Sequence, residues 1–407
     1  MKTSMHVPSI KRLAILLLGL AIMLGSTRPA QGQGGGEVTE ARAEHRFGEE
    51  VQFFARIQSA GVIQSVSVTI RPVGGLAQTQ AMSVNADGTA GYRFDALTNP
   101  LPAFAQIVYW FDVTLADGTR FASAQQEFIY SDNRFGWLGL DSQNVRVHWY
   151  EGDAAFGAAA LDAAQRGIES VQNLVPIEPA VPMDIYIYAR AADLQSAIDL
   201  GGKSGMAGHA SPEHGVAMIL VPPDTAYELD RHIPHELAHL LLYQSLGPRY
   251  YNLPVWLREG LATNAEIYPN SDLEATLTDA VNANALFPLA DLCASFPRES
   301  VSALQAYAQA KSFVRFLIDR FGTTGLSALI SAYADGMDCE QGANRALEQP
   351  LSQLDVLWRE SALGENRGGV ALANLLPYFV VLGLAMFIPL WGWASRALAR
   401  RKLARRD

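Results

Sequence analysis

Two histidines stand four residues apart in the segment IPHELAHLLLYQ, and a glutamate directly follows the first of them: His235, Glu236 and His239. Residues at i and i+4 lie on one face of a helix, so both imidazole rings can reach a single metal ion. Glu236 is turned by about 100° from His235, which places its carboxylate beside the metal rather than on it. This spacing predicts a His-Glu-x-x-His zinc site in which Glu236 accepts a proton from water. The alternative is a helix that contains two histidines and binds nothing.

A catalytic zinc site needs a third protein ligand and an open position. Glu259 follows His239 by twenty residues in PVWLREGLATNAEIY, where helical spacing buries it among apolar residues such as Trp256 and Leu261. A buried carboxylate without a partner is costly, and a zinc ion removes that cost. Neighbouring Arg258 does not remove it, because adjacent residues on a helix point apart. Pro234, just ahead of the first histidine, suits the first turn of its helix.

The two motifs together resemble the gluzincin metallopeptidases, in particular the bacterial peptidase MA-like domains. The likeness rests on His-Glu-x-x-His at 235–239 and Trp-Leu-x-Glu-Gly-Leu-Ala at 256–262, and it extends over about residues 140–362. It implies a thermolysin-like α+β domain with a helical C-terminal lobe. In such a domain one zinc ion per chain is bound by His235, His239 and Glu259, and Glu236 is the general base.

A further segment, AYAQAKSFVRFLIDRFG, is similar to the Tyr-x-Lys-Gly helix of the gluzincin aminopeptidases. That likeness implies that Tyr307 stabilises the oxyanion, although the lysine and glycine are not reproduced. The alternative is a tyrosine on a helix face with its hydroxyl at the surface. The Gly-x-Met-Glu-Asn motif that recognises a free amino terminus is absent, which favours an endopeptidase. The aspartate that orients a histidine ligand is absent too, since Thr263 and Asn264 stand there.

The resemblance also implies a substrate that lies extended along an edge strand. The apolar run GVAMILV, residues 215–221, is the candidate edge strand, and Ala217, Met218 and Ile219 are its candidate substrate-binding residues.

Three further histidines lie near the motif. His209 and His214 precede the candidate strand; they could line the cleft, but we favour solvent-exposed turn residues. His232, one turn before His235, is interpreted as structural, because a fourth ligand would close the site.

The elements that position these residues fall into two regions. Residues 37–135 show alternating apolar runs separated by the turn signal ADGT at 86–89 and 116–119. This pattern predicts an all-β sandwich of immunoglobulin or fibronectin type III kind, either a binding module or a spacer. From residue 144 strands alternate with helices, and after the metal motif the pattern is helical to about residue 362.

Both ends of the chain carry targeting signals. A basic start, the apolar residues 13–25 and a small polar stretch predict a signal peptide over residues 1–32, with an uncleaved anchor as the alternative. Residues 370–394 carry no charge and are long enough to span a membrane, with a buried core helix as the alternative. The basic tail 395–407 then lies in the cytoplasm. We therefore expect a single-pass cell-membrane protein with an extracytoplasmic body.

Composition narrows the remaining classes. Apolar residues make up 49% and charged residues 18%, which excludes a disordered chain. The net charge is −10, and both ends of the chain are basic, so the region between them is still more acidic and nucleic acid is not expected as a partner. In an exported protein Cys293 and Cys339 are free to form a disulfide; two unpaired thiols are the alternative.

The sequence thus predicts a membrane-anchored zinc peptidase acting on a peptide or protein substrate. The rival hypothesis is a non-enzymatic surface protein for binding or adhesion, with a structural or vestigial zinc site. Glu236 favours the enzyme, because a structural site needs no general base.

Overall fold

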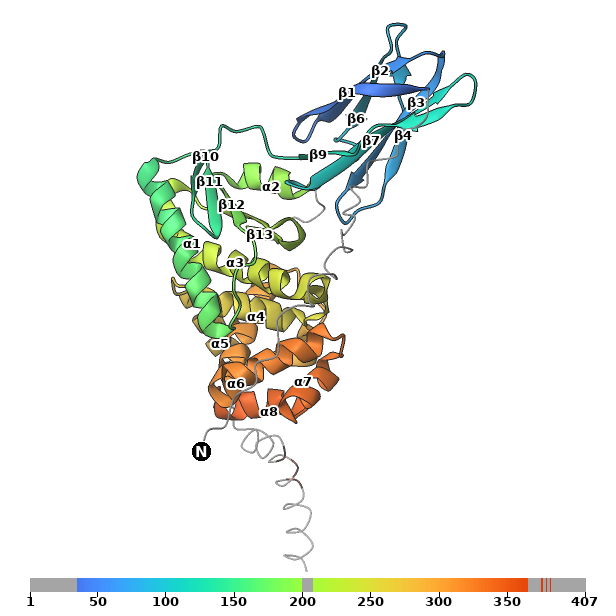
Figure 1. The fold of residues 1–407 in the computed structure, drawn as a ribbon. Helices are drawn as coiled ribbons and strands as arrows, with labels where there is room; N and C mark the ends of the chain where they lie inside the picture. Colours follow the sequence, from blue (N-terminus) through green and yellow to red (C-terminus); the bar gives the residue numbers. More distant parts are fainter. Residues whose placement is uncertain (1–34, 200–207, 365–374, 376–377, 379–380, 382–407) are drawn as a thin grey trace, which may run out of the picture.

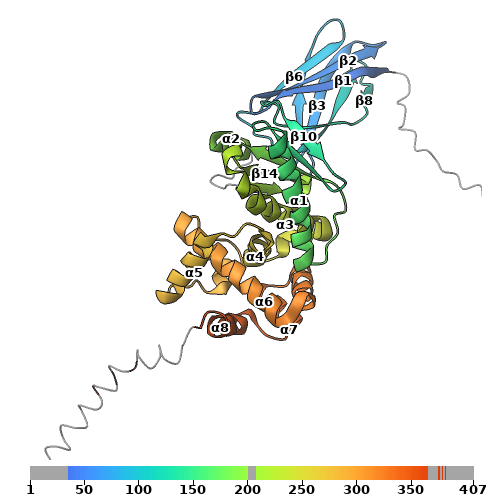
Figure 2. The same cartoon turned by 90° about the vertical axis from the view of Figure 1, so that its left-hand side faces the viewer.

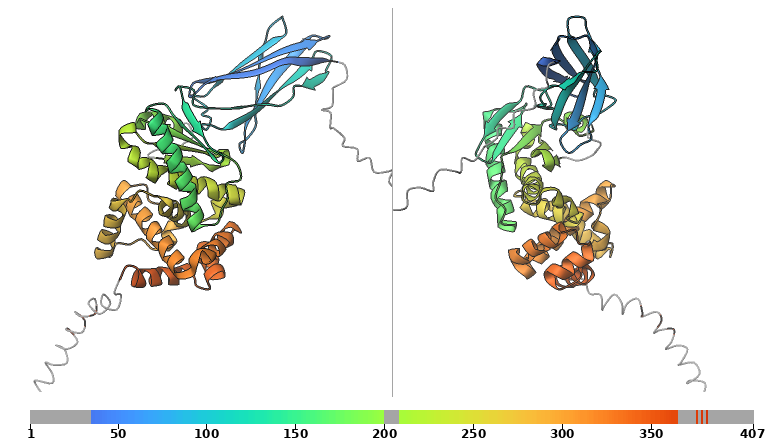
Figure 3. Two further views of the ribbon diagram at one scale, coloured as in Figure 1. Left: turned by 60° about the vertical axis from the view of Figure 1, so that its left-hand side comes forward. Right: turned by 45° about the vertical axis from the view of Figure 1, so that its right-hand side comes forward.

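The structure is a computed structural model in which residues 35–199 and 208–364 and the single residues 375, 378 and 381 are described. A β-rich region, an α/β layer and a helical lobe follow one another along the chain and in space (Figures 1 and 3). The predicted order, an all-β N-terminal region before a helical domain, is confirmed.

The predicted targeting segments are largely beyond this description. The signal peptide 1–32 and the basic tail 395–407 lie outside the described residues, and so does the span 370–394 apart from three positions. Among the residues that are described, no helix combines the length and the apolarity needed to cross a bilayer.

The β-rich region consists of two antiparallel sheets that share one hydrophobic core. Side chains alternate along its strands, so that Val51, Phe53 and Ala55 are buried while Gln52 and Arg56 are exposed. The first sheet runs in the order β1 (Gly36–Arg46), β2 (Glu50–Ser59), β6 (Thr89–Asp95) and β5 (Ser83–Val84). The second contains β4 (Gln78–Ala81), β3 (Ile63–Pro72), β7 (Gln106–Leu115), β8 (Arg120–Ala122) and β9 (Gln126–Ile129).

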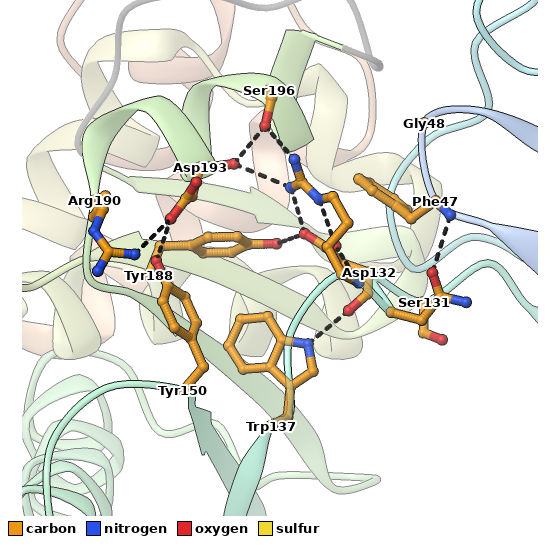
Figure 4. A network of polar contacts seen from close by, with 12 residues as sticks. Phe47, Gly48, Ser131, Asp132, Trp137, Tyr150, Tyr188, Arg190, Asp193 and Ser196 are labelled. Atoms are coloured by element: carbon orange, nitrogen blue, oxygen red, sulfur yellow. Dashed lines mark hydrogen bonds and ion pairs between the residues drawn. The ribbon is translucent and has the colours of Figure 1, made fainter.

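A segment of eight residues, 130–137, carries the chain from β9 into the α/β layer and is tied to both. Asp132 is fully buried there; Arg134 donates to it twice, at 2.8 and 2.6 Å, and the hydroxyl of Tyr188 donates at 2.9 Å (Figure 4). The guanidinium of Arg134 also donates to Ser196 and lies over the ring of Phe47. The carboxylate of Asp132 therefore joins the linking segment to the next sheet, and Arg134 extends this network to Phe47 in the β-rich region.

The α/β layer is a five-stranded sheet in the order β10 (Leu138–Asp141), β11 (Val145–Trp149), β12 (Met183–Tyr188), β14 (Val216–Leu220) and β13 (Gly208–Ser211). The three middle strands are parallel, and the two outer strands pair antiparallel. Helix α1 (Ala154–Leu174) connects β11 to β12 and starts at Asp153, whose carboxylate accepts the amide N–H of Phe156. The short helix α2 (Ala191–Asp199) follows β12.

One face of this sheet packs against α1 and α3 (Leu229–Leu246), as Figure 2 shows. Small residues on α1 let α3 approach closely: a side chain at Gly167 would meet Cα of Pro234 at 3.1 Å. The opposite face, with Tyr188 and Met218, packs into the core of the β-rich region. The sheet is therefore covered on both faces, which a parallel sheet requires.

The helical lobe lies on the far side of α3 from the sheet (Figure 2). Its core contains three fully buried rings, Trp256, Phe313 and Trp358. The α-helices of the lobe are α4 (Val255–Ala265), α5 (Ser271–Asn282), α6 (Ser300–Ala334), α7 (Cys339–Leu347) and α8 (Leu351–Ser361). The predicted helical character after the metal motif agrees with this arrangement.

Cys293 and Cys339 form a disulfide, with their Cα atoms 6.4 Å apart. It joins the residue after the 3₁₀ helix Leu289–Leu292 to the first residue of α7. The carbonyl of Cys293 accepts the amide N–H of Val255 at 2.8 Å, and the indole N–H of Trp256 points to Sγ of Cys339. The bond thus anchors the beginning of α4.

Candidate metal centre

The two histidines of the motif lie on α3 and Glu259 lies on the facing helix α4. Oε2 of Glu259 is 3.6 Å from Nε2 of His235 and 3.6 Å from Nε2 of His239. Ligand atoms around a tetrahedral zinc ion, with bonds of about 2.0–2.1 Å, lie about 3.4 Å apart. The donor set and its spacing therefore fit one zinc ion with a further position open to solvent or substrate.

The other ring nitrogen of each histidine is held by a second residue. Nδ1 of His235 lies 3.0 Å from Oε1 of Glu266, and Nδ1 of His239 lies 3.0 Å from the hydroxyl of Tyr250. A proton on each Nδ1, donated to these oxygens, leaves the lone pair of each Nε2 facing the metal position. Thr263 and Asn264 stand where the related motif has its orienting aspartate, and their side chains hydrogen-bond to main-chain carbonyls.

The position of Glu266 depends on Pro234 in the facing helix. Helix α3 begins at Leu229, one turn before the predicted start, so that Pro234 lies inside the helix and not in its first turn. Proline has no N–H, which leaves the carbonyl of Asp230, four residues earlier, without its helical partner. That carbonyl accepts the amide N–H groups of Ile267 at 2.9 Å and Tyr268 at 3.1 Å. The segment that follows α4 is therefore fastened to α3 beside His235.

Electrostatics prepare the site for a cation. Burial lowers the pKa of His235, but its contacts with Glu259 and Glu266 outweigh that effect and raise the pKa to about 10. Burial raises the pKa of Glu259, and the two histidines more than offset this and hold it below its usual range. Without a metal, the imidazole of His235 is therefore protonated and positively charged. Binding of a zinc ion releases that proton and replaces its charge.

Glu236 lies between the metal ligands and the strand β13. Its side chain is 6% exposed and accepts the amide N–H of Ala210 on that strand. Gly208, also on β13, makes room for it, since a Cβ there would stand 3.1 Å from Cδ of Glu236. Burial raises the pKa of Glu236, as suits a group that must take up a proton.

Residues 163–364 match the family model of the Peptidase MA superfamily. The match begins within α1, ends just beyond α8 and includes both motif segments. It supports a peptidase MA-like domain in this chain, as the resemblance implied.

Comparisons with curated proteins and with solved structures do not indicate a function. Among curated proteins no sequence match was found. Solved structures that are similar include a Br derivative of BhCBM56 (15% identity, TM-score 0.19, 24% of this chain and 99% of that chain). A carbohydrate-binding module family 56 β-1,3-glucan-binding domain is 20% identical with a TM-score of 0.17, over 22% of this chain and 95% of that chain. OgpA from Akkermansia muciniphila is 17% identical with a TM-score of 0.20, over 26% and 31%. TM-scores this low support no argument about function.

Within the matched region, the candidate metal centre opens into a cavity of about 530 Å³. Tyr307, on α6, lines this cavity, and its ring centroid lies 6.2 Å from that of His235. The rings of Phe296 and Tyr307 pack edge to face, with their centroids 5.1 Å apart. Burial, then the charges of Glu259 and Glu236, raise the pKa of Tyr307, so its hydroxyl stays protonated and can donate.

The predicted edge strand is wrong. Strand β14, which carries Ala217, Met218 and Ile219, lies between β12 and β13, and these residues are 0%, 2% and 0% exposed. Ala217 and Ile219 face α1 and α3, while Met218 faces the core of the β-rich region. The outer strand on this side of the described sheet is β13, so a substrate strand would pair there.

Two of the remaining histidines differ from the interpretation favoured by the sequence. His209 lies on β13 and lines the cavity, and His214 is half-buried in the 3₁₀ helix Pro212–His214, so neither is an exposed turn residue. His232 lines the cavity outside the ligand triad, and burial lowers its pKa to about 4. It is therefore neutral at physiological pH, and its structural role stays a prediction.

Proposed function

We propose that this protein is a zinc-dependent endopeptidase. The observation that carries the proposal is a three-residue ligand set with a buried glutamate directly beside it, at the outer strand of a sheet. The Peptidase MA superfamily match supports peptidase activity, and the donor set supports zinc. A structural zinc site closes its coordination with four protein ligands, whereas this cluster contains three.

Glu236 and Tyr307 each have a role in peptide hydrolysis beside the zinc ion. A zinc ion, when bound, supplies a Lewis acid that polarises the scissile carbonyl and lowers the pKa of water. Glu236 accepts the proton of the attacking water and delivers it to the leaving amine. The hydroxyl of Tyr307 donates to the oxygen that becomes negative.

An extended peptide fits the cleft through its backbone. Strand β13 is the last strand of the described sheet on the cavity side, and its next neighbour inward is β14. A peptide added beside β13 forms main-chain hydrogen bonds that do not depend on sequence. Such pairing brings a bond in the middle of a chain to the metal centre, which supports an endopeptidase.

We further propose an extracytoplasmic location, with the predicted span 370–394 as anchor and the tail 395–407 in the cytoplasm. The disulfide between Cys293 and Cys339 supports it, because disulfides persist in oxidising compartments.

Metal dependence tests the proposal. The purified full-length protein in detergent is expected to contain one zinc ion per chain and to hydrolyse a fluorescently labelled, denatured protein. Removing the zinc with a chelator should abolish the activity, and adding back one zinc ion per chain should restore it. The three ligands without zinc cannot polarise the scissile carbonyl of the substrate. If the zinc-loaded protein cleaves no denatured protein or peptide library, the non-enzymatic surface protein becomes the better account.

A further inference from the structure

Two arginines line the cavity of the metal centre, and they differ in their partners. Arg231 is paired with Glu228, whose Oε2 lies 2.7 Å from its Nη1. Arg258 has no carboxylate within 4.0 Å among the described residues, and its Nε is buried without a hydrogen-bond partner. Arg258 is therefore the cavity cation whose charge is not neutralised by a direct ion pair within the described chain.

The guanidinium of Arg258 is held in place by an aromatic ring. Its Cζ lies 5.1 Å from the centroid of Tyr250, which is buried and in contact with Tyr243 and Tyr251. The guanidinium also hydrogen-bonds to the hydroxyl of Tyr250. Because a guanidinium has five N–H donors in a planar fork, further N–H groups remain for a carboxylate. The hydroxyl of the same tyrosine contacts His239, so the arginine is built into the support of the metal centre.

This cation lies close to the bond that is cleaved. The Tyr250 ring centroid is 6.4 Å from that of His239 and 5.1 Å from Cζ of Arg258, so Cζ lies within about 12 Å of the His239 ring. An extended peptide advances about 3.3–3.6 Å per residue. A group bound by Arg258 therefore belongs to one of the few residues next to the scissile bond.

Within the cavity, the positive charge of Arg258 favours an anion at this point. The cavity is lined by four carboxylates, Glu213, Glu236, Glu259 and Glu266, which repel a negative substrate elsewhere. Glu213 accepts the hydroxyl of Tyr251 at 2.8 Å and is not within ion-pair distance of the arginine. The anions that a peptide brings are carboxylates, and a carboxylate matches the fork of a guanidinium.

We propose that Arg258 forms a substrate subsite for a carboxylate within a few residues of the scissile bond. This inference rests on the proposed peptidase function. The carboxylate comes either from the C-terminus of the peptide or from an Asp or Glu side chain, and one set of peptides separates the two sources.

The test uses three peptides of one sequence: an amidated neutral peptide, the same peptide with a free C-terminus, and an amidated peptide with Gln changed to Glu near the cleavage site. The parent protein is expected to prefer one carboxylate peptide over the neutral one by about 10- to 100-fold in kcat/KM. Arg258→Gln should reduce that ratio towards one, and Arg258→Lys should leave an intermediate ratio. Preference for the free C-terminus identifies a C-terminal subsite, and preference for Glu identifies a side-chain subsite.

Arg231→Gln is the matched control, because it removes a positive charge from the same cavity while Arg258 is retained. Zinc content is measured for every variant, since Tyr250 links the arginine to His239. A parent protein without preference, an Arg258→Gln protein that retains it, or an equal loss in Arg231→Gln overturns the proposal.

Measuring peptide affinity tests the subsite at Arg258 independently of the peptidase function. The zinc-loaded Glu236→Gln protein retains the subsite, so fluorescently labelled peptides should show the same carboxylate preference in equilibrium affinity. If the parent cleaves no peptide, the peptidase proposal fails, and this affinity difference still decides for or against the subsite at Arg258.

Discussion

In each histidine of the candidate metal centre, the ring nitrogen Nδ1, which faces away from the metal position, hydrogen-bonds to a second residue. The sequence predicts the ligands His235, His239 and Glu259 because helical spacing converts directly into a shared face. It does not predict Glu266 or Tyr250, because their positions depend on where α4 ends and on the 3₁₀ turn before it. The only signal for Glu266 was a carboxylate in an otherwise uncharged segment, ATNAEIY.

Replacing Glu266 tests the support of His235. Glu266→Gln removes the carboxylate that accepts from Nδ1, so the zinc dissociation constant is expected to rise about 10- to 100-fold. Competition with a chromophoric chelator measures it. Glu274→Gln, at an exposed position of α5, is the control and should leave the constant unchanged. Equal affinities for both variants would show that Glu266 does not orient the ligand.

At the scale of elements, strand β13 lies directly against the motif helix α3 at Glu236. The sequence assigned the edge to residues 215–221 because they form a continuous apolar run, yet such a run is typical of a strand covered on both faces. The true outer strand, Gly208–Ser211, is four small or polar residues without an alternating pattern, so it carries no strand signal. Pairing with β14 determines it, and this is tertiary information.

Gly208 tests the contact between β13 and the glutamate. In Gly208→Ala the new methyl group must displace the carboxylate of Glu236, while the backbone stays in place because the side chain can swing. We expect kcat to fall about 100-fold with zinc content retained. Gly139→Ala is the control, because Gly139 lies on β10, at the opposite edge of the sheet. A Cβ there would be 3.5 Å from its nearest atom, Nδ1 of His148, which is ordinary van der Waals contact. Equal activity of the two variants would contradict the account.

At the scale of the molecule, the β-rich region and the α/β layer share one hydrophobic core and one buried carboxylate. The order of these regions follows from their sequence periodicity, because alternation and helical spacing are local signals. Their mutual placement does not, since it depends on the contact of Asp132 and Arg134 with Tyr188, which lies 56 residues after Asp132, and none of the three belongs to a motif. Met218, predicted to meet substrate, is buried in this junction instead.

Asp132→Ala tests the junction. It leaves the hydroxyl of Tyr188 and the guanidinium of Arg134 without their buried acceptor, so the free energy of unfolding should fall by about 3 kcal/mol. Urea denaturation followed by circular dichroism measures the loss. Asp112→Ala, at an exposed position of β7, should change it by less than about 0.5 kcal/mol. A junction variant as stable as this control would mean that the two regions are held together by apolar contacts alone.

Glu236→Gln tests the central claim most directly, because it changes one oxygen beside the ligands and none of the ligands themselves. The account predicts that the variant binds one zinc ion per chain as the parent does and hydrolyses a denatured protein about 10²- to 10⁴-fold more slowly. A Glu236→Gln protein that is loaded with zinc and cleaves its substrate at the parent rate would contradict it.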